Sequence, residues 1–210
     1  IQTAAQGAQV DVITAARSTG SIMKPLLYAA MLQEGSIIPT SLIPDIPTQI
    51  RGYRPENFHE DYDGVVSAER ALVRSLNIPL VRMLQQHGLE KFHYQLQQLD
   101  FATITQPPEH YGLTLILGGA ETTLEQITNT YACMARTLNH FIPQSGAYQV
   151  NDFRSINYVA KPTKSSSESL QKDAPYFDAA AIYQTFQAME AVERPNSEGE
   201  WANFASSRRI

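Results

Sequence analysis

The feature that most constrains the fold is the segment at residues 22–34, which is apolar on nearly every face of a helix. A helix of this kind is stable only when other elements cover it on all sides. Gly35 follows the run directly and supplies a signal for the end of the helix. The segment therefore predicts a central helix around which the rest of a domain packs.

Helical signals also dominate the rest of the chain. Ser67 predicts the N-cap of a short helix that runs to residue 74, Pro79 suits the first turn of the next helix, and Gly88 suits its end. Thr123 and Gln126 have the spacing of a capping box. The helix after this box is expected to place one apolar face on the core, made of Leu124, Ile127, Tyr131, Met134 and Leu138.

Little sheet is expected. Alternating patterns that favour strands are confined to residues 8–14 and 111–117. The prolines at 39, 44, 47 and 55 are too dense for a helix or an interior strand, so an extended, ordered loop is expected there. A loop-like insertion is expected at about 142–174, followed by a last helix at 177–192. These patterns predict a mainly α fold.

Composition excludes several classes of function. The chain has 210 residues, 43% of them hydrophobic, which is enough to bury the core of one domain. A net charge of −5, without a basic stripe, argues against nucleic acid as a partner. No apolar run reaches the length of a membrane span. Because the chain opens at Ile1 without a methionine, we expect that it comes from a longer protein.

Ser21 and Lys24 begin the apolar helix with the spacing S-x-x-K. A serine hydroxyl is a weak nucleophile that needs a base beside it, and residues three positions apart share a helix face. Burial beside Ile22, Met23, Leu26 and Leu27 would make the Lys24 amine neutral and therefore basic. Pro25 has no N–H to give to the Ser21 carbonyl, so the first turn should be irregular.

The spacing alone is weak, because a second S-x-x-K pair occurs at Ser169 and Lys172. That pair lies in a polar, serine-rich stretch that cannot desolvate a lysine, so it is interpreted as solvated loop. The same lysine chemistry therefore favours Ser21 and Lys24.

A second short motif, S-x-N, supplies further polar groups. Ser75 offers a hydroxyl for proton relay, and Asn77 offers an amide able to hold a peptide bond, where a helix breaks before Pro79. The same spacing recurs at Ser155 and Asn157, but it precedes the polar S-x-x-K pair instead of following it. The order S-x-x-K and then S-x-N is met by Ser21, Lys24, Ser75 and Asn77.

These motifs are joined by "GYRPENF" at 52–58, "DGVVSAERALVRSLNIP" at 63–79 and "YGLTLILGGAETTLEQITNTYA" at 111–132. Together they resemble the transpeptidase domain of class A penicillin-binding proteins. The resemblance implies the helical portion of an α/β, β-lactamase-like fold. It also implies acyl transfer, with Ser21 as nucleophile, Lys24 as its activating base, Ser75 as proton relay and Asn77 as a substrate-binding residue.

The resemblance further implies the partners and the location. Such domains act on peptidoglycan stem peptides, are acylated by β-lactam antibiotics, and need no cofactor. They lie on the extracytoplasmic, periplasmic face of the bacterial inner membrane, and the membrane anchor belongs to N-terminal segments that this sequence does not contain.

One departure from the family is large, because no K-T-G occurs in the sequence. The resemblance places that strand beyond the C terminus, so residues 1–210 would form a partial transpeptidase domain in which most sheet strands are missing. Without the strand that completes the oxyanion hole, we expect slow or undetectable acylation of the 210-residue chain. We also expect an exposed apolar flank on the helix at 22–34, with self-association through it.

The histidines at 59, 87, 93, 110 and 140 lack a metal-binding spacing, and Asp61 with Asp63 and Gly64 falls short of a calcium loop, so no metal site is expected. The alternative to catalysis is a helical binding module that keeps the family's shape but does not turn over a substrate.

Overall fold

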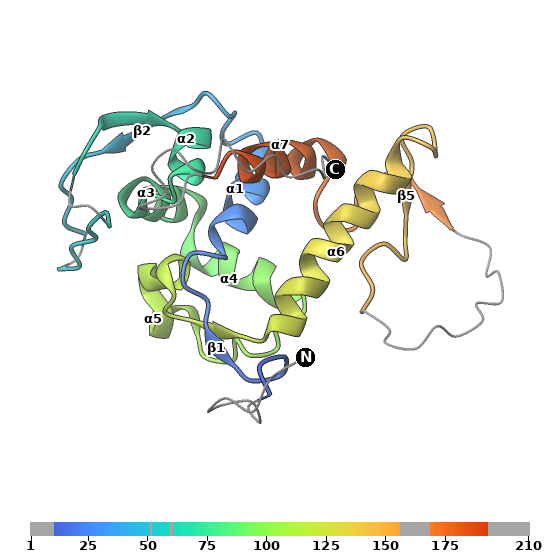
Figure 1. Ribbon diagram of the computed structural model, residues 1–210, viewed down its shortest axis with the longest axis horizontal. Helices are drawn as coiled ribbons and strands as arrows, with labels where there is room; N and C mark the ends of the chain where they lie inside the picture. The colour runs from blue at the N-terminus through green and yellow to red at the C-terminus, as the bar shows by residue number, and fades with distance from the viewer. Residues whose placement is uncertain (1–10, 51, 59–60, 156–168, 193–210) are drawn as a thin grey trace, which may run out of the picture.

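The computed structural model describes residues 11–50, 52–58, 61–155 and 169–192. Helices are the main secondary structure of this part of the chain, and the strands within it form three two-stranded antiparallel sheets (Figure 1). The mainly α fold predicted from the sequence is therefore confirmed. None of the described helices is both long and apolar enough to cross a bilayer.

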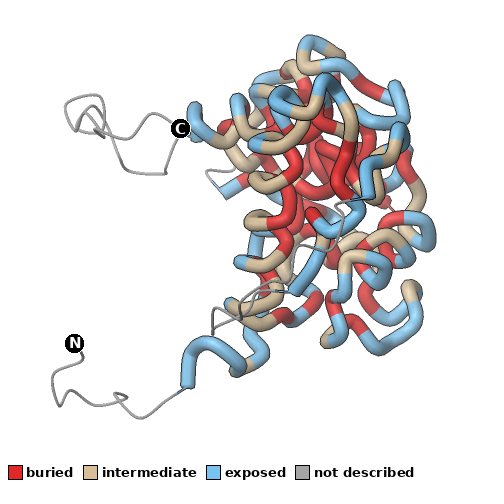
Figure 2. Tube along the Cα trace, turned by 90° about the vertical axis from the view of Figure 1, so that its right-hand side faces the viewer, coloured by how far each residue is buried: buried red, intermediate tan, exposed pale blue. Residues whose placement is uncertain are grey.

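Helix α1 (Lys24–Gln33) is the central element, as predicted. It packs against α7 (Ala179–Glu190), α2 (Ala68–Val73) and α3 (Asn77–His87), and Figure 1 shows it at the middle of the molecule. The burial colouring of Figure 2 places the buried segments in the interior of the described chain. Residues 26–31 are each at most 3% exposed, so the exposed apolar flank expected on this helix is wrong.

The helices after α1 begin and end at the residues that the sequence marked. The Ser67 hydroxyl accepts a hydrogen bond from the Arg70 N–H and caps α2. Pro79 lies in the first turn of α3, and Gly88 ends that helix with φ of 101°. Helix α4 (Leu89–Gln98) follows at once.

The strand predicted at residues 111–117 is wrong. The segment forms the end of α5 (Pro108–Tyr111) and a 3-10 helix, η1 (Gly112–Leu117). Gly112 and Gly118 have φ of 53° and 105°, which break an extended backbone at both sides. Leu115 and Ile116 are adjacent in the chain, and both are fully buried. In a strand with one buried and one solvated face, adjacent side chains point to opposite faces, so one of the two would be exposed.

Helix α6 (Leu124–Phe141) has the predicted capping box, because Thr123 and Gln126 each cap the other's backbone. Its buried positions include Ile127 and Met134, as expected. Leu124 does not belong to this face, because 52% of it is exposed. The apolar face therefore begins one turn later than the sequence suggested.

Two of the sheets lie close to the motifs. Strand β1 (Arg17–Ser18) pairs with β4 (Glu121–Thr122), and β2 (Leu42–Asp45) pairs with β3 (Gly64–Ser67). The second pair corrects the prediction of a loop around the prolines. Pro44 stands opposite Val65 in a sheet of only two strands, so its missing N–H costs no ladder bond in a sheet interior.

The strand predicted at residues 8–14 is also corrected where it can be compared. Residues 11–14 form a turn in which the Asp11 carboxylate accepts hydrogen bonds from the Ile13 and Thr14 N–H groups. Such local bonds compete with strand pairing. Residues 8–10 of the prediction lie outside the described residues.

The region at 142–174 is described at 142–155 and 169–174 and contains turns and the short strands β5 (Tyr148–Gln149) and β6 (Leu170–Gln171). Its remaining residues, 156–168, lie outside the described part of the chain. The last helix, α7, was predicted and begins at the Asp178 N-cap, whose carboxylate accepts from the Ala181 N–H at 2.6 Å.

Candidate active site

Lys24 is the most unusual side chain of the described structure for its surroundings. It begins α1, is only 1% exposed, and its amine lies among oxygen atoms of the S-x-N motif. Nζ lies 2.7 Å from the Ser75 carbonyl oxygen, 3.2 Å from the Ser75 hydroxyl and 2.8 Å from Asn77 Oδ1. Desolvation by burial lowers the pKa of Lys24 from 10.5 to about 7.

Ser75 reaches Lys24 because the backbone reverses at the end of α2. The Leu76 N–H donates to the Ala71 carbonyl and the Ser75 N–H to the Leu72 carbonyl, both at 2.9 Å, which is a Schellman motif. Ser75 occupies the left-handed position of this motif with φ of 52°, where glycine is usual. This conformation turns both oxygens of Ser75 toward the lysine.

Asn77 is the first residue of α3, and its amide is held at both ends. Nδ2 donates to the Glu56 carbonyl at 2.8 Å, which leaves Oδ1 to accept from Lys24. The orientation of the amide is therefore fixed by its partners, since a lysine amine needs an acceptor and a carbonyl needs a donor.

Ser21 lies in the turn that precedes α1. Its carbonyl accepts from the Lys24 N–H at 3.1 Å, and the residue is exposed. Among the described residues, no hydrogen bond involves its hydroxyl. The irregular first turn expected from Pro25 is confirmed, because the helix proper begins only at Lys24.

The segment that carries Ser21 is anchored to the turn before α6. The Thr19 N–H donates to the Ala120 carbonyl at 3.0 Å, and the Ser18 hydroxyl donates to the Gly118 carbonyl at 2.8 Å. A Cβ on Gly118 would lie 2.8 Å from the Ser18 hydroxyl and 2.9 Å from the backbone of Gly20, so only glycine fits there. Gly118 thus allows the turn before α6 to approach the Ser21 segment closely.

Three of the four predicted site residues are in contact: the Lys24 amine meets the side chains of Ser75 and Asn77. Ser21 is linked to Lys24 by the turn bond between their backbones. No contact among the described residues joins the Ser21 hydroxyl to the other three, so its place in the site stays a prediction. The second S-x-x-K pair is elsewhere: Ser169 accepts from the Val150 N–H beside β6, and Asn157 of the second S-x-N pair lies outside the described residues.

The sequence did not reveal Asn57, which is 20 positions from the S-x-N motif in the chain but hydrogen-bonds to it directly. Asn57 is 3% exposed, and its Oδ1 accepts from the Asn77 N–H at 3.0 Å. Asn57 belongs to the segment at 52–58 that carried part of the family resemblance, but no local pattern marks a cap that acts across 20 positions.

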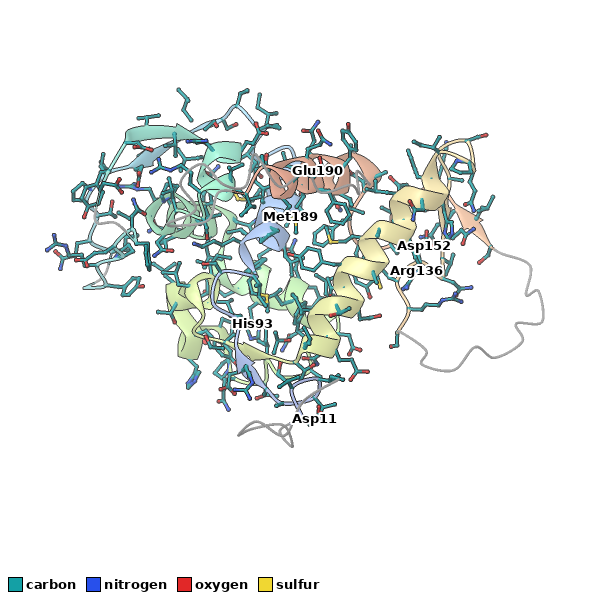
Figure 3. The ribbon with its side chains drawn as sticks, viewed as in Figure 1. Asp11, His93, Arg136, Asp152, Met189 and Glu190 are labelled. Carbon is teal, nitrogen blue, oxygen red and sulfur yellow. The ribbon has the colours of Figure 1, made fainter. Side chains whose placement is uncertain are left out.

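A separate polar cluster lies at α6. The Asp152 carboxylate is 2.7 Å from His140 Nδ1, and Arg136 donates to the Asp152 carbonyl at 3.0 Å. Figure 3 labels Arg136 and Asp152 beside α6. Within the described part of the chain, no group of three or more His, Cys, Asp or Glu side chains could hold a metal ion.

Comparison with known proteins places these observations in a family. The family model described as the penicillin binding protein transpeptidase domain matches residues 3–200. Penicillin-binding protein 1C of Escherichia coli K12 is 39% identical over 127 residues, which cover 60% of this chain and 16% of that protein. The match therefore spans less than a fifth of this relative's length.

Solved structures show the same fold. Penicillin-binding protein 1A of Haemophilus influenzae matches with a TM-score of 0.54 and 27% identity, over 63% of this chain and 20% of that one. The transpeptidase domain of penicillin-binding protein 3 from Burkholderia pseudomallei matches with a TM-score of 0.62 and 16% identity, over 88% and 56%. The chain thus belongs to the penicillin-binding protein transpeptidase family and has the helical portion of that fold.

Proposed function

We propose that this chain carries the acyl-transfer centre of a serine-type D,D-transpeptidase of peptidoglycan synthesis. Ser21 is the nucleophile, Lys24 its base, Ser75 a proton relay and Asn77 a substrate-binding residue. The observation that carries the proposal is the buried amine of Lys24, with a pKa of about 7, in contact with both residues of the S-x-N motif.

The contacts of Lys24 support its role as a base. A neutral amine has two N–H donors and one lone pair. The Ser75 carbonyl and Asn77 Oδ1 can only accept, so they engage both N–H groups. The lone pair is then left for a hydroxyl, either that of Ser75 or that of Ser21 one turn earlier in the chain.

The reaction proceeds in two acyl transfers. In the first, the Ser21 oxygen bonds to the carbonyl carbon of the penultimate D-alanine, Lys24 accepts the hydroxyl proton, and the amide bond to the last D-alanine breaks. Lys24 then gives this proton to the Ser75 oxygen while the Ser75 hydroxyl gives its own proton to the departing amine, so both residues end the step as they began. In the second, an amine of a neighbouring stem peptide attacks the ester, which releases Ser21 and restores its proton through Lys24.

The partners and the location follow from family membership. Peptidoglycan stem peptides are the substrates, and β-lactams acylate Ser21 because their strained amide imitates the scissile bond. The domain then works at the periplasmic face of the bacterial inner membrane.

Because no K-T-G occurs among the 210 residues, we expect this chain alone to acylate slowly or not detectably. Self-association of the chain stays a prediction, but an exposed apolar flank of α1 no longer explains it.

The test is labelling with a fluorescent penicillin, followed by peptide mass spectrometry, on the 210-residue chain and on a longer chain that continues past Ile210. We expect the adduct on Ser21 and its loss in Ser21→Ala, while Ser169→Ala labels normally. Labelling that survives Ser21→Ala would overturn the assignment. A longer chain that folds but never labels would instead favour the non-catalytic binding module.

A further inference from the structure

We propose that Asn57 is a positioning residue for the candidate active site, and that it holds Asn77, and through it the Lys24 amine, in place with the help of Asp45. Its consequence for catalysis rests on the proposed function, but its effect on Lys24 does not. Asn57 is buried, comes from the segment before β3, and acts on the site through Asn77, since no role in binding substrate is assigned to Asn57 itself.

The side chain of Asn57 caps helix α3 from outside that helix. Its Oδ1 accepts from the Asn77 N–H at 3.0 Å and from the Ile78 N–H at 3.3 Å. Leu76, the N-cap residue, makes no side-chain cap hydrogen bond. Asn57 therefore performs a task that a serine, aspartate or asparagine at the N-cap usually performs.

The other end of the Asn57 amide is anchored just as firmly. Its Nδ2 donates to Asp45 Oδ1 at 2.8 Å and to the Asp61 carbonyl at 3.0 Å. Asp45 is 1% exposed, and its second oxygen accepts from the Asp63 N–H at 3.1 Å. All hydrogen-bonding directions of the Asn57 amide are thus used, which fixes its orientation.

Asn77 connects residues 56 and 57 to the Lys24 amine. The neighbouring carbonyl of Glu56 accepts from Asn77 Nδ2, so residues 56 and 57 hold the Asn77 backbone and side chain together. Asn77 Oδ1 then faces Lys24 at 2.8 Å. If the anchor is lost, the turn that carries Ser75 and Asn77 loosens and water reaches the amine, whose low pKa depends on its burial.

The first experiment needs no mutation. Hydrogen exchange of the Asn77 and Ile78 amides should be about tenfold slower than that of Glu90 in the first turn of α4, whose Gly88 N-cap has no side chain. Equal exchange rates in the two helices would overturn the cap.

The second experiment uses Asn57→Ala, with Asp178→Ala as the matched control because it removes the cap of α7 instead. We expect Asn57→Ala to speed the exchange of Asn77 and Ile78 about tenfold. Its NMR titration should show the pKa of Lys24 about one unit higher than in the parent chain. The control should leave both values unchanged.

A third variant guards against a simple failure to fold. Asn57→Asp alone sets two carboxylates against each other, whereas Asn57→Asp with Asp45→Asn restores a donor facing an acceptor between residues 45 and 57, and only the bond to the Asp61 carbonyl is not restored. The double variant should therefore exchange Asn77 and Ile78 more slowly than the single variant. Failure of this rescue would contradict the pairing of residues 45 and 57.

Activity separates the proposal from the proposed function. In a chain that labels with penicillin, Asn57→Ala should lower the acylation rate constant per labelled site about tenfold or more, not merely the labelled fraction. An unchanged rate constant and an unchanged Lys24 titration would overturn the positioning role and leave Ser21 as nucleophile. Altered exchange and titration in a longer chain that continues past Ile210, folds and never labels would uphold the positioning of Lys24 and overturn the transpeptidase assignment.

Discussion

Burial of the Lys24 amine costs desolvation energy, and it also lowers the pKa to a value that suits a general base. Its three oxygen neighbours favour the ammonium, but desolvation outweighs them and lowers the pKa to about 7. An amine with this pKa is partly neutral at physiological pH and can still accept a proton, and a pKa near the working pH suits a general base. The oxygens of Ser75 and Asn77 therefore fix the position of the amine, but they do not keep it fully charged.

The acylation rate should follow the ionisation of Lys24. Below pH 7, the rate constant for β-lactam acylation of a labelling-competent chain should fall about tenfold per pH unit, because the neutral amine declines in that proportion. Above pH 7 the rate should level off. Lys24→Met should abolish acylation, whereas Lys91→Ala, which removes an exposed amine paired with Glu34, should leave the pH profile unchanged. A rate independent of pH between 5.5 and 7 would show that the base is another group.

The turn between α2 and α3 stores conformational strain at the element scale. Ser75 adopts a left-handed conformation that costs about 1–2 kcal/mol for a residue with a Cβ. The Schellman hydrogen bonds around it enforce the conformation. A glycine would fit this position without strain and would keep the carbonyl, so the serine is explained by its hydroxyl beside Lys24 and not by the turn.

Substitutions at Ser75 should separate stability from activity. Ser75→Gly should be more stable than Ser75→Ala by about 1 kcal/mol, because both lose the hydroxyl and only glycine relieves the strain. Both variants should lose most acylation. Urea unfolding measures the first effect and penicillin labelling the second. Equal stability of the two variants would mean that the left-handed backbone at position 75 carries no cost.

The elements also show which parts of the fold a sequence can predict. Ser67, Gly88 and the Thr123 capping box act within one turn of their own helices, and each was predicted from local residues. The segment at 111–117 was misinterpreted, because its alternation was fortuitous and the flanking glycines decide the backbone. Asn57 caps a helix across 20 positions, so its role depends on tertiary structure alone.

The same distinction holds for the site. The pairing of Ser21 with Lys24 and of Ser75 with Asn77 was predicted from spacing and order, and direct contacts join Lys24 to the second pair. The left-handed backbone of Ser75 was not predicted, because serine gives no local signal for it. Spacing thus identifies reactive groups, and packing determines how they are held.

At the scale of the whole molecule, the core is built around a helix that contains a buried ionisable group. Helices α2, α3 and α7 pack against α1 (Figure 1), and Lys24 at the start of α1 is only 1% exposed. The same packing that stabilises the apolar residues 26–31 penalises the ammonium at residue 24. The stability of the fold is therefore coupled to the protonation of its candidate base.

This coupling gives the stability of the chain a specific dependence on pH. The pKa of Lys24 is about 7 in the folded chain against an ordinary value of 10.5. Between these values the unfolded chain holds a proton that the folded chain lacks, so the free energy of unfolding rises with pH. The slope from this residue approaches 1.4 kcal/mol per pH unit, roughly, within that window and vanishes below pH 7, where both states are protonated.

Lys24→Met isolates this contribution, because it removes the ionisable group and keeps a long side chain. The variant leaves the Ser75 carbonyl and Asn77 Oδ1 without a donor at every pH, which is a constant cost. Subtracting its unfolding free energy from that of the parent chain at each pH between 6 and 10 cancels the other titrating groups. The difference should be flat up to about pH 7 and then rise in favour of the parent chain, as measured by urea unfolding. A difference that stays flat to pH 10 would mean that Lys24 keeps its proton in the folded chain, and Lys24 could not then be the base.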